Sequence, residues 1–391
     1  HQVDNSLKLD QRLPEGHNYK GSYFVNNIYR TFSTANLYYN FENGQERYGG
    51  GVNREFLTPG ITFGGGINLN WNNVWNTPVK VDTSERIAYR QQDYWIGYAA
   101  SKPDAEEFKG NRFLFSGRLI RTLYDIKPIR YNRSGYYNSD FYLGSVGYFN
   151  RKFYKDNYIF RLGRTEDIPE GHLVSFTYGH QEAGSNSKNY YGMNATYCKF
   201  INHFGYLYGS VGIGSFRVKN DWQEGVQFAR VLYYTPLLNW GKWKHRTFIG
   251  VRYTEGINNG GLITLDRESG FRGLSSGLLA GKTKMVVNLE FDVFPYFNIA
   301  GFKLGLLAFA DFGWVANQSK LFDKKNFYPG YGIGLRIKNE HLVFNMFQIL
   351  LTYYPTAYRL DEQTLQLFER TKYFYNFTDI DYSRPTTIPY F

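Results

Sequence analysis

Strict alternation of apolar and polar residues constrains the fold of this chain more than any other feature. From Ile61 to Trp71, apolar side chains or glycine occupy the odd positions, and Asn, Thr or glycine occupy the even ones. The same two-residue period runs through 283–294 and 249–254. Successive side chains of a β-strand point to opposite faces, so this period predicts strands. One face of each strand meets an apolar environment and the other a polar one.

Sixteen segments of this kind can be marked along the 391 residues. An even number lets a single antiparallel chain close on itself, and short turns alternate with long loops such as 72–86 and 256–282. We therefore expect an all-β, 16-stranded antiparallel transmembrane β-barrel. The segments are 36–43, 54–71, 87–100, 112–125, 139–154, 157–165, 172–182, 189–201, 205–216, 227–240, 244–255, 283–297, 302–315, 328–339, 342–355 and 372–383.

Composition favours a membrane wall over a water-soluble sheet. Tyr, Phe and Trp make up 19% of the chain, yet its mean hydropathy is only −0.48. A barrel wall that alternates lipid-facing and water-facing residues has both properties. A soluble β-sandwich or propeller, the alternative, would carry fewer Tyr and Trp near its strand ends. Residues 1–35 are more polar and less regular, so we expect a periplasmic leader there, or the stump of an upstream module, ahead of a barrel over 36–391.

Catalytic, metal and nucleic-acid sites are not predicted. The seven His lack metal-ligand spacing, and the one Cys, Cys198, has no nominated base and cannot form an internal disulfide. The glycine-rich runs do not match a phosphate loop. The net charge of +11 is scattered rather than gathered on a basic helix, which excludes nucleic acid and favours anionic lipopolysaccharide. We predict no enzyme activity, no catalytic residue and no cofactor.

Four short motifs follow one another between 271 and 336. They are Phe271-Arg272-Gly273-Leu274, Asn288-Leu289-Glu290-Phe291, Phe309-Ala310-Asp311-Phe312-Gly313 and Gly330-Tyr331-Gly332-Ile333-Gly334-Leu335-Arg336. In this order and spacing they resemble the loop and strand motifs of the BamA and two-partner-secretion transporter superfamily, the bacterial surface antigen type of barrel. Leu274 stands where the family usually has an aromatic residue.

The resemblance implies a site inside the barrel. In the family, the loop corresponding to 256–282 folds into the lumen, and its arginine meets lumen acids. Arg272 would accordingly pair with Asp311 or Glu290, forming a lumen latch with Gly273 and Gly313, while Phe271 and Leu274 complete the loop motif. Strand parity independently turns Glu290 and Asp311 toward the lumen.

The resemblance also implies a function in the bacterial outer membrane, namely insertion or translocation of other polypeptides. Implied partners are membrane lipids and lipopolysaccharide, unfolded outer-membrane or secreted clients, and periplasmic or lipoprotein subunits. A lateral seam would join 36–43, with Tyr38 and Tyr39, to 372–383, with Tyr375 and Phe377. Three alternatives stay open: a passive porin-like channel, an adhesive barrel, and the barrel portion of a fusion with a patatin-like or phosphoesterase domain.

Overall fold

The computed structural model describes residues 2–9, 17–56, 61–76, 85–101, 111–128, 136–159, 162–266, 270–272, 279–298, 301–317, 320–339, 347–356, 365–370 and 383–390. The first strands are β1 (Gln2–Leu9), β2 (His17–Ile28), β3 (Ser33–Glu42), β4 (Gln45–Arg54), β5 (Phe63–Asn76), β6 (Glu85–Ser101), β7 (Arg112–Ile126), β8 (Ser139–Asn157), β9 (Thr165–Ala183), β10 (Asn186–Ile201) and β11 (Gly205–Val218). The later ones are β12 (Asp221–Tyr234), β13 (Leu238–Trp240), β14 (Trp243–Ile257), β15 (Ile263–Thr264), β16 (Ala280–Gly281), β17 (Thr283–Pro295), β18 (Phe302–Ala316), β19 (Phe327–Asn339), β20 (Phe347–Tyr353) and β21 (Leu365–Arg370). A short 3-10 turn, η2 (Lys324–Asn326), precedes β19.

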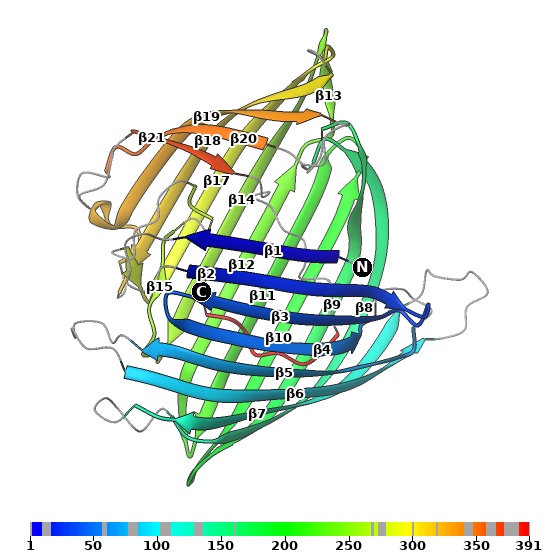
Figure 1. Cartoon of the computed structure of the whole chain (residues 1–391). Coiled ribbons are helices and arrows are strands. Elements are labelled where there is room, and N and C mark those ends of the chain that lie inside the picture. Colours follow the sequence, from blue (N-terminus) through cyan, green and yellow to red (C-terminus); the bar gives the residue numbers. More distant parts are fainter. Residues whose placement is uncertain are drawn as a thin grey trace.

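One 19-stranded antiparallel sheet contains every described strand except β15 and β16, which pair with each other. Almost every strand pairs with the strands next to it in the chain. The exception is at β14, which pairs with β12 and β13 on one side and with β17 on the other. Figure 1 shows the result, a strongly curved sheet in which β1–β7 cross in front of β8–β14. We call the face inside this curve the inner face.

The two faces of the sheet carry different side chains, as the alternation predicts. Along β17, Leu289 and Phe291 are 37% and 39% exposed, whereas the intervening Glu290 is 3% exposed. Large exposed apolar side chains cover the outer face from β3 to β19; among them are Leu37, Val52, Phe63, Ile67, Ile96, Phe113, Phe115, Val146, Phe176, Met193, Tyr197, Val211, Ile213, Val231, Leu306 and Ile333. An apolar band of this extent is a surface that water does not favour.

The strand count differs from the sixteen predicted. β4 was missed because its sequence, QERYGGGVNR, is rich in glycine and polar residues, and only Tyr48 and Val52 add large side chains to its outer face. The segment 157–165 is not a strand, since Tyr158 and Gly163 have positive φ angles of 58° and 74° at the turn between β8 and β9. The predicted 227–240 divides into β12 and the short β13.

The predicted boundary between a leader or module stump at 1–35 and a barrel over 36–391 also needs correction. β1 pairs with β2 from Gln2 opposite Phe24 to Leu9 opposite His17, and β2 pairs in turn with β3. This backbone pairing extends the sheet by two strands, and Tyr19 and Tyr23 of β2 continue its exposed aromatic face. The sheet therefore begins well before residue 36.

Closure of the barrel and the position of the seam differ from the prediction as well. Among the described residues β1 pairs only with β2 and β21 only with β20, so the sheet is open between these two edges. Tyr38 and Tyr39 lie in β3, which is paired on both sides, and hence not at an edge. The other half of the predicted seam, 372–383 with Tyr375 and Phe377, lies outside the described residues apart from Ser383.

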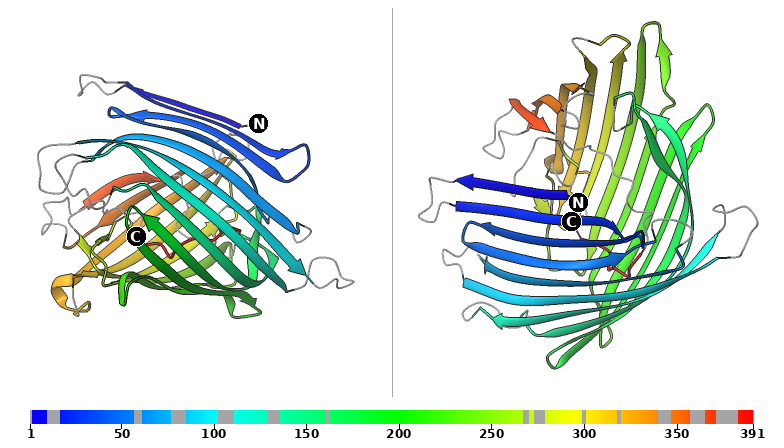
Figure 2. Two further views of the ribbon diagram at one scale, coloured as in Figure 1. Left: turned by 90° about the horizontal axis from the view of Figure 1, so that it is seen from below. Right: turned by 45° about the vertical axis from the view of Figure 1, so that its right-hand side comes forward.

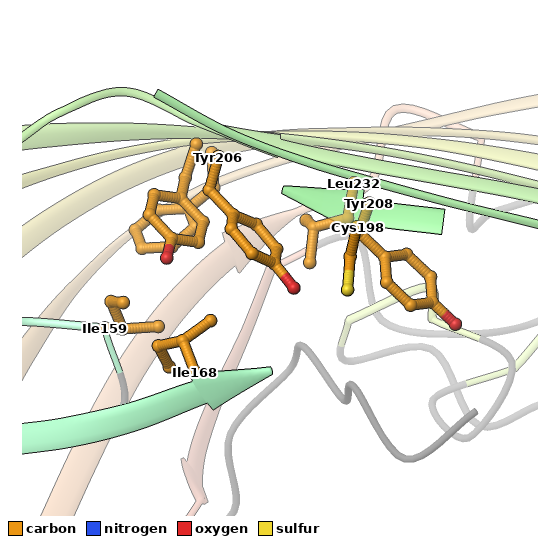
Figure 3. Packing of buried hydrophobic residues seen from close by; sticks show 8 residues of the cluster. Ile159, Ile168, Cys198, Tyr206, Tyr208 and Leu232 are labelled. Carbon is orange, nitrogen blue, oxygen red and sulfur yellow. The ribbon is translucent and has the colours of Figure 1, made fainter. Parts of the chain in front are cut away.

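The far end of the β8–β9 hairpin bends over the inner face. Asp156 of β8 accepts hydrogen bonds of 2.9 and 3.0 Å from both terminal guanidinium nitrogens of Arg246 in β14, although these strands are not neighbours. Beside this pair lies a buried cluster that includes Cys198, and Figure 3 shows its side chains converging between the hairpin and the wall. The cluster comprises Ile159, Ile168, Cys198, Tyr206, Tyr208, Leu232, Tyr234 and Phe248.

No helix in the described part of the chain has the length and apolar character needed to cross a membrane.

Candidate functional site

The loop between β14 and β17 returns across the inner face before the chain re-enters the sheet. The two-residue strands β15 and β16 pair at its base, where the Leu265 N–H donates to the Leu279 carbonyl over 2.7 Å. Lys284 of β17 donates to the Thr264 carbonyl over 3.1 Å. These bonds fix the direction of the loop, so that residues 270–272 lie against β17 and β18.

Arg272 is the centre of a buried ionic network. Its guanidinium grips the Asp311 carboxylate with two hydrogen bonds, of 2.9 Å from Nε and 2.7 Å from Nη2, and Nη1 bonds Glu290. The Arg272 side chain is 2% exposed, Glu290 2% and Asp311 0%. A planar guanidinium matches a carboxylate in this two-pronged geometry, which makes the contact both strong and directional.

Two neighbours complete the surroundings of Arg272. The Asn288 amide donates 2.7 Å to Asp311 and 2.9 Å to the Gly270 carbonyl, which ties the loop backbone to β17. The Phe309 ring lies 3.9 Å from the guanidinium carbon, a cation–π contact. Asn288 and Asp311 are direct partners in the β17–β18 ladder, so the sheet register itself places them together.

A second arginine, Arg336 of β19, extends the network along the inner face. It donates 2.6 Å to Glu290, bonds Asp292 and donates 2.9 Å from Nε to Gln348. Glu290 therefore lies between two guanidinium groups, and the whole network contains three carboxylates and two arginines from the loop, β17, β18 and β19. Burial of so many charges is tolerated only because each one has a charged partner.

Apolar packing seats the loop beside the charges. Phe271 is fully buried and contacts Tyr354, with ring centroids 5.8 Å apart. A Cβ on Gly313 would lie 2.6 Å from Leu265 and 3.1 Å from Phe271, so only glycine leaves room for the loop at this point of β18. Phe309 and Asp311 of the 309–313 motif thus contact Arg272, and Gly313 faces Leu265 and Phe271.

Replacing Gly313 with valine should unseat the loop and lower the free energy of unfolding by about 1–3 kcal/mol, the usual cost of overpacking. The added side chain would collide with Leu265 and Phe271. Limited proteolysis within 256–282 measures the loop directly. Gly144→Val is the matched control, because nothing lies within 4 Å of a Cβ at Gly144. Equal protection of the loop in both variants would contradict the packing role of Gly313.

The structure brings Arg272, Glu290, Asp311, Gly313 and Phe271 together on the inner face. Gly273 and Leu274 lie outside the described residues. Reasoning from the sequence did not include Asn288, Asp292, Phe309 or Arg336 among the site residues. The sequence did contain a signal for them. Asn288, Phe309 and Arg336 belong to the four motifs, and Asp292 lies on the same strand face as Glu290.

Within the described ranges, no group of three or more His, Cys, Asp or Glu side chains has the geometry to hold a metal ion.

Comparisons with known proteins give structural likenesses only. No family model matches the sequence, and no curated protein sequence does. Among solved structures, BamA from Haemophilus ducreyi lacking POTRA domains 1–3 is similar at 12% identity and a TM-score of 0.43; the match covers 94% of this chain and 74% of that one.

Two further solved structures are similar at the same level. CdiB from Acinetobacter baumannii has 13% identity and a TM-score of 0.39, with 90% of this chain and 62% of that one covered. The siderophore receptor PirA from Pseudomonas aeruginosa has 9% identity and a TM-score of 0.41, covering 90% of this chain and 65% of that one. The chain thus spans less than two-thirds of CdiB and of PirA.

Proposed function

We propose that this chain is a BamA-like barrel of the bacterial outer membrane that inserts or translocates other polypeptides. The observation that carries the proposal is the loop held on the inner face by Arg272, which bonds Asp311 and Glu290. This is the contact that the resemblance of the 271–274 and 309–313 motifs implies for the lumen latch. The activity requires no catalytic residue, cofactor or nucleotide.

The outer face supports a location in a lipid bilayer. The large apolar side chains of β3 to β19 point away from the inner face, where they would contact acyl chains, whereas the charged network lies inside. This polarity is the one that membrane barrels show. Lipopolysaccharide is the expected anionic neighbour of the chain's net charge of +11.

The open edges support contact with an unfolded client. β1 and β21 each pair on one side only among the described residues, so each leaves one row of backbone donors and acceptors without a sheet partner. Such a row can template an incoming strand by β-augmentation. We therefore move the proposed lateral seam from 36–43 to β1, with β21 or residues that follow it on the other side. Periplasmic or lipoprotein subunits would deliver the client.

The proposal is tested with the full chain reconstituted into liposomes. A client, a small outer-membrane barrel diluted from urea, should fold about tenfold faster in liposomes that contain the chain than in empty liposomes. This gain equals a lowering of the activation barrier by about 1.4 kcal/mol. Folding is followed by the heat-dependent gel shift of the client. Arg272→Ala should lose most of the acceleration per folded molecule, whereas Arg90→Ala, which breaks only an exposed ion pair with Asp125, should keep it.

A passive porin is the competing outcome of the same preparation. Client folding at the rate of empty liposomes, together with a steady, large and ion-selective conductance in planar bilayers, would overturn the proposal in favour of the porin-like channel.

A further inference from the structure

The C-terminal residues 383–390 run across the inner face, far from the strands that precede them in the chain. Figure 2 shows this red segment inside the curve of the sheet. Near its start, Arg118 of β7 donates 2.9 Å to the Pro385 carbonyl, and the same guanidinium grips Asp93 of β6 with bonds of 2.7 and 2.8 Å. Arg384 also reaches Asp93, at 3.4 Å. The segment is therefore fastened to β6 and β7 at one end.

Its other end is fastened to the opposite wall. The Ile388 N–H donates 2.7 Å to the hydroxyl of Tyr190 in β10. The Tyr390 hydroxyl lies 3.3 Å from the Gly261 carbonyl and 3.2 Å from the Lys282 carbonyl, at the two ends of the loop that carries Arg272. Burial raises the pKa of Tyr390 above its ordinary value, and its single hydroxyl proton is shared between these two carbonyls.

Glycines of the wall leave space for the side chains of the segment. A Cβ on Gly256 would lie 2.5, 2.7 and 2.9 Å from three atoms of Tyr390, and it would meet no other residue more closely. A Cβ on Gly214 would lie 2.2 Å from the Tyr190 hydroxyl and 2.9 Å from Ile388, and one on Gly212 would lie 2.4 Å from Phe228 and 3.2 Å from Ile388. The wall therefore has two recesses, one for an aliphatic residue and one for an aromatic residue two positions later.

A cavity runs along the segment from Ser383 to Pro389. Ser383, Arg384, Thr386 and Thr387 border this cavity of about 450 Å³, whose other walls include Ser175 and Thr177 of β9 and Asn194 of β10. A segment that is bound by a few directed contacts beside a cavity with both polar and apolar walls is held as a ligand is held, rather than as a core strand is.

We propose that the inner face from β6 to β14 is a binding site for an extended peptide, and that residues 383–390 occupy it in cis as a displaceable plug. The ligand class is a short peptide with small polar residues and a proline, followed by an aliphatic and then an aromatic side chain. The contacts that carry this inference do not involve Arg272, Glu290 or Asp311, so it holds whether or not the chain moves other polypeptides.

Emptying the site within the full chain tests the inference. The variant Ile388→Asp/Tyr390→Ala removes the two side chains that fill the recesses and leaves the wall unchanged. A fluorescent synthetic peptide with the sequence of residues 383–390, SRPTTIPY, should then bind this variant saturably in detergent, measured by anisotropy. The wild-type chain should bind at least about tenfold more weakly, because a tethered segment competes at an effective concentration in the millimolar range. Equal binding to both chains, or no saturable binding to the folded variant, would overturn the proposal.

A wall variant separates specific binding from adhesion to the exposed interior. Gly256→Ala, added to the emptied chain, should weaken the peptide about tenfold because its methyl group fills the Tyr390 recess. Gly209→Ala is the matched control, since a Cβ there meets nothing within 4 Å. Peptide affinity that is the same in both variants would contradict the assigned recess.

Hydrogen exchange of the intact chain tests occupancy even if the emptied variant does not fold. Tyr190→Phe removes the acceptor of the Ile388 N–H but keeps the ring beside Phe141 and Phe216. Exchange at 386–390 should accelerate about three- to tenfold, while exchange in β17 and β18 stays unchanged. Exchange of this segment at the rate of an unfolded peptide in the wild-type chain would show that the site is empty.

Discussion

Replacing Arg272 with alanine should lower the free energy of unfolding by about 3–5 kcal/mol, the cost of breaking a buried ion pair. Asp311, which is fully buried, would keep the Asn288 amide but lose the two-pronged guanidinium. Arg272→Lys should recover less than half of the loss, because an ammonium cannot donate along two parallel directions. The measurement is urea-induced loss of the folded, heat-sensitive gel band in detergent micelles.

An exposed ion pair provides the control for Arg272→Ala. Arg90 and Asp125 are bonded over 2.8 Å, but each side chain is 46% exposed, so Arg90→Ala should cost only about 0–1 kcal/mol. Adding Asp311→Ala to Arg272→Ala should cost little more, because the partners act as one unit. Equal stability of Arg272→Ala and Arg90→Ala would mean that the buried network does not hold the loop.

Replacing Arg336 with alanine should have an effect of similar size, again about 3–5 kcal/mol. This change would leave Asp292, which is fully buried, without its guanidinium, and Glu290 would keep Arg272 alone. Because Arg336 lies in β19 and does not contact the loop, limited proteolysis of 256–282 should stay close to wild type. The Arg272 and Arg336 variants should therefore differ in proteolysis of the loop, although they lose similar amounts of global stability.

The matched control for Arg336 is Arg121→Ala. Arg121 grips Asp140 with the same two-pronged geometry, at 2.7 and 2.8 Å, but the two side chains are 42% and 24% exposed. Its removal should cost about 0–1 kcal/mol. If Arg121→Ala lowers the free energy of unfolding as much as Arg336→Ala does, the two-pronged geometry, and not burial, would be the cause of the loss.

The alternation of apolar and polar residues predicted the strands of the site closely, but it missed strands in which the pattern is weak. The segments 244–255, 283–297, 302–315 and 328–339 correspond to β14, β17, β18 and β19 within a few residues. β1, β2 and β4 have more polar sequences with few aliphatic residues, and they belong to the sheet through backbone pairing that the alternation pattern did not reveal. Open edges at β1 and β21 likewise depend on pairing between distant segments, which local sequence does not encode.

The candidate site was predictable as far as motifs and parity extend. Arg272, Glu290 and Asp311 were expected to meet, and the structure brings them within bonding distance; their role as a latch in function stays a prediction. Arg336 and Asp292 belong to the same network but were not singled out, because parity alone assigns a face and cannot choose partners along it. The C-terminal segment had no signal at all, since its contacts connect it to β6, β7 and β10 across the whole chain.

The buried network also imposes an order on folding. Every ladder between the described strands joins segments that are close in sequence, so hairpins can be added one after another with little loss of chain entropy. The carboxylates of β17 and β18 cannot be buried as soon as these two strands pair. They stay hydrated until both arginines are in place to neutralise them. Arg336 arrives only with β19, the last contributor. We therefore expect a folding intermediate that ends at β18 to retain a hydrated interior, which expels its water in a single late step.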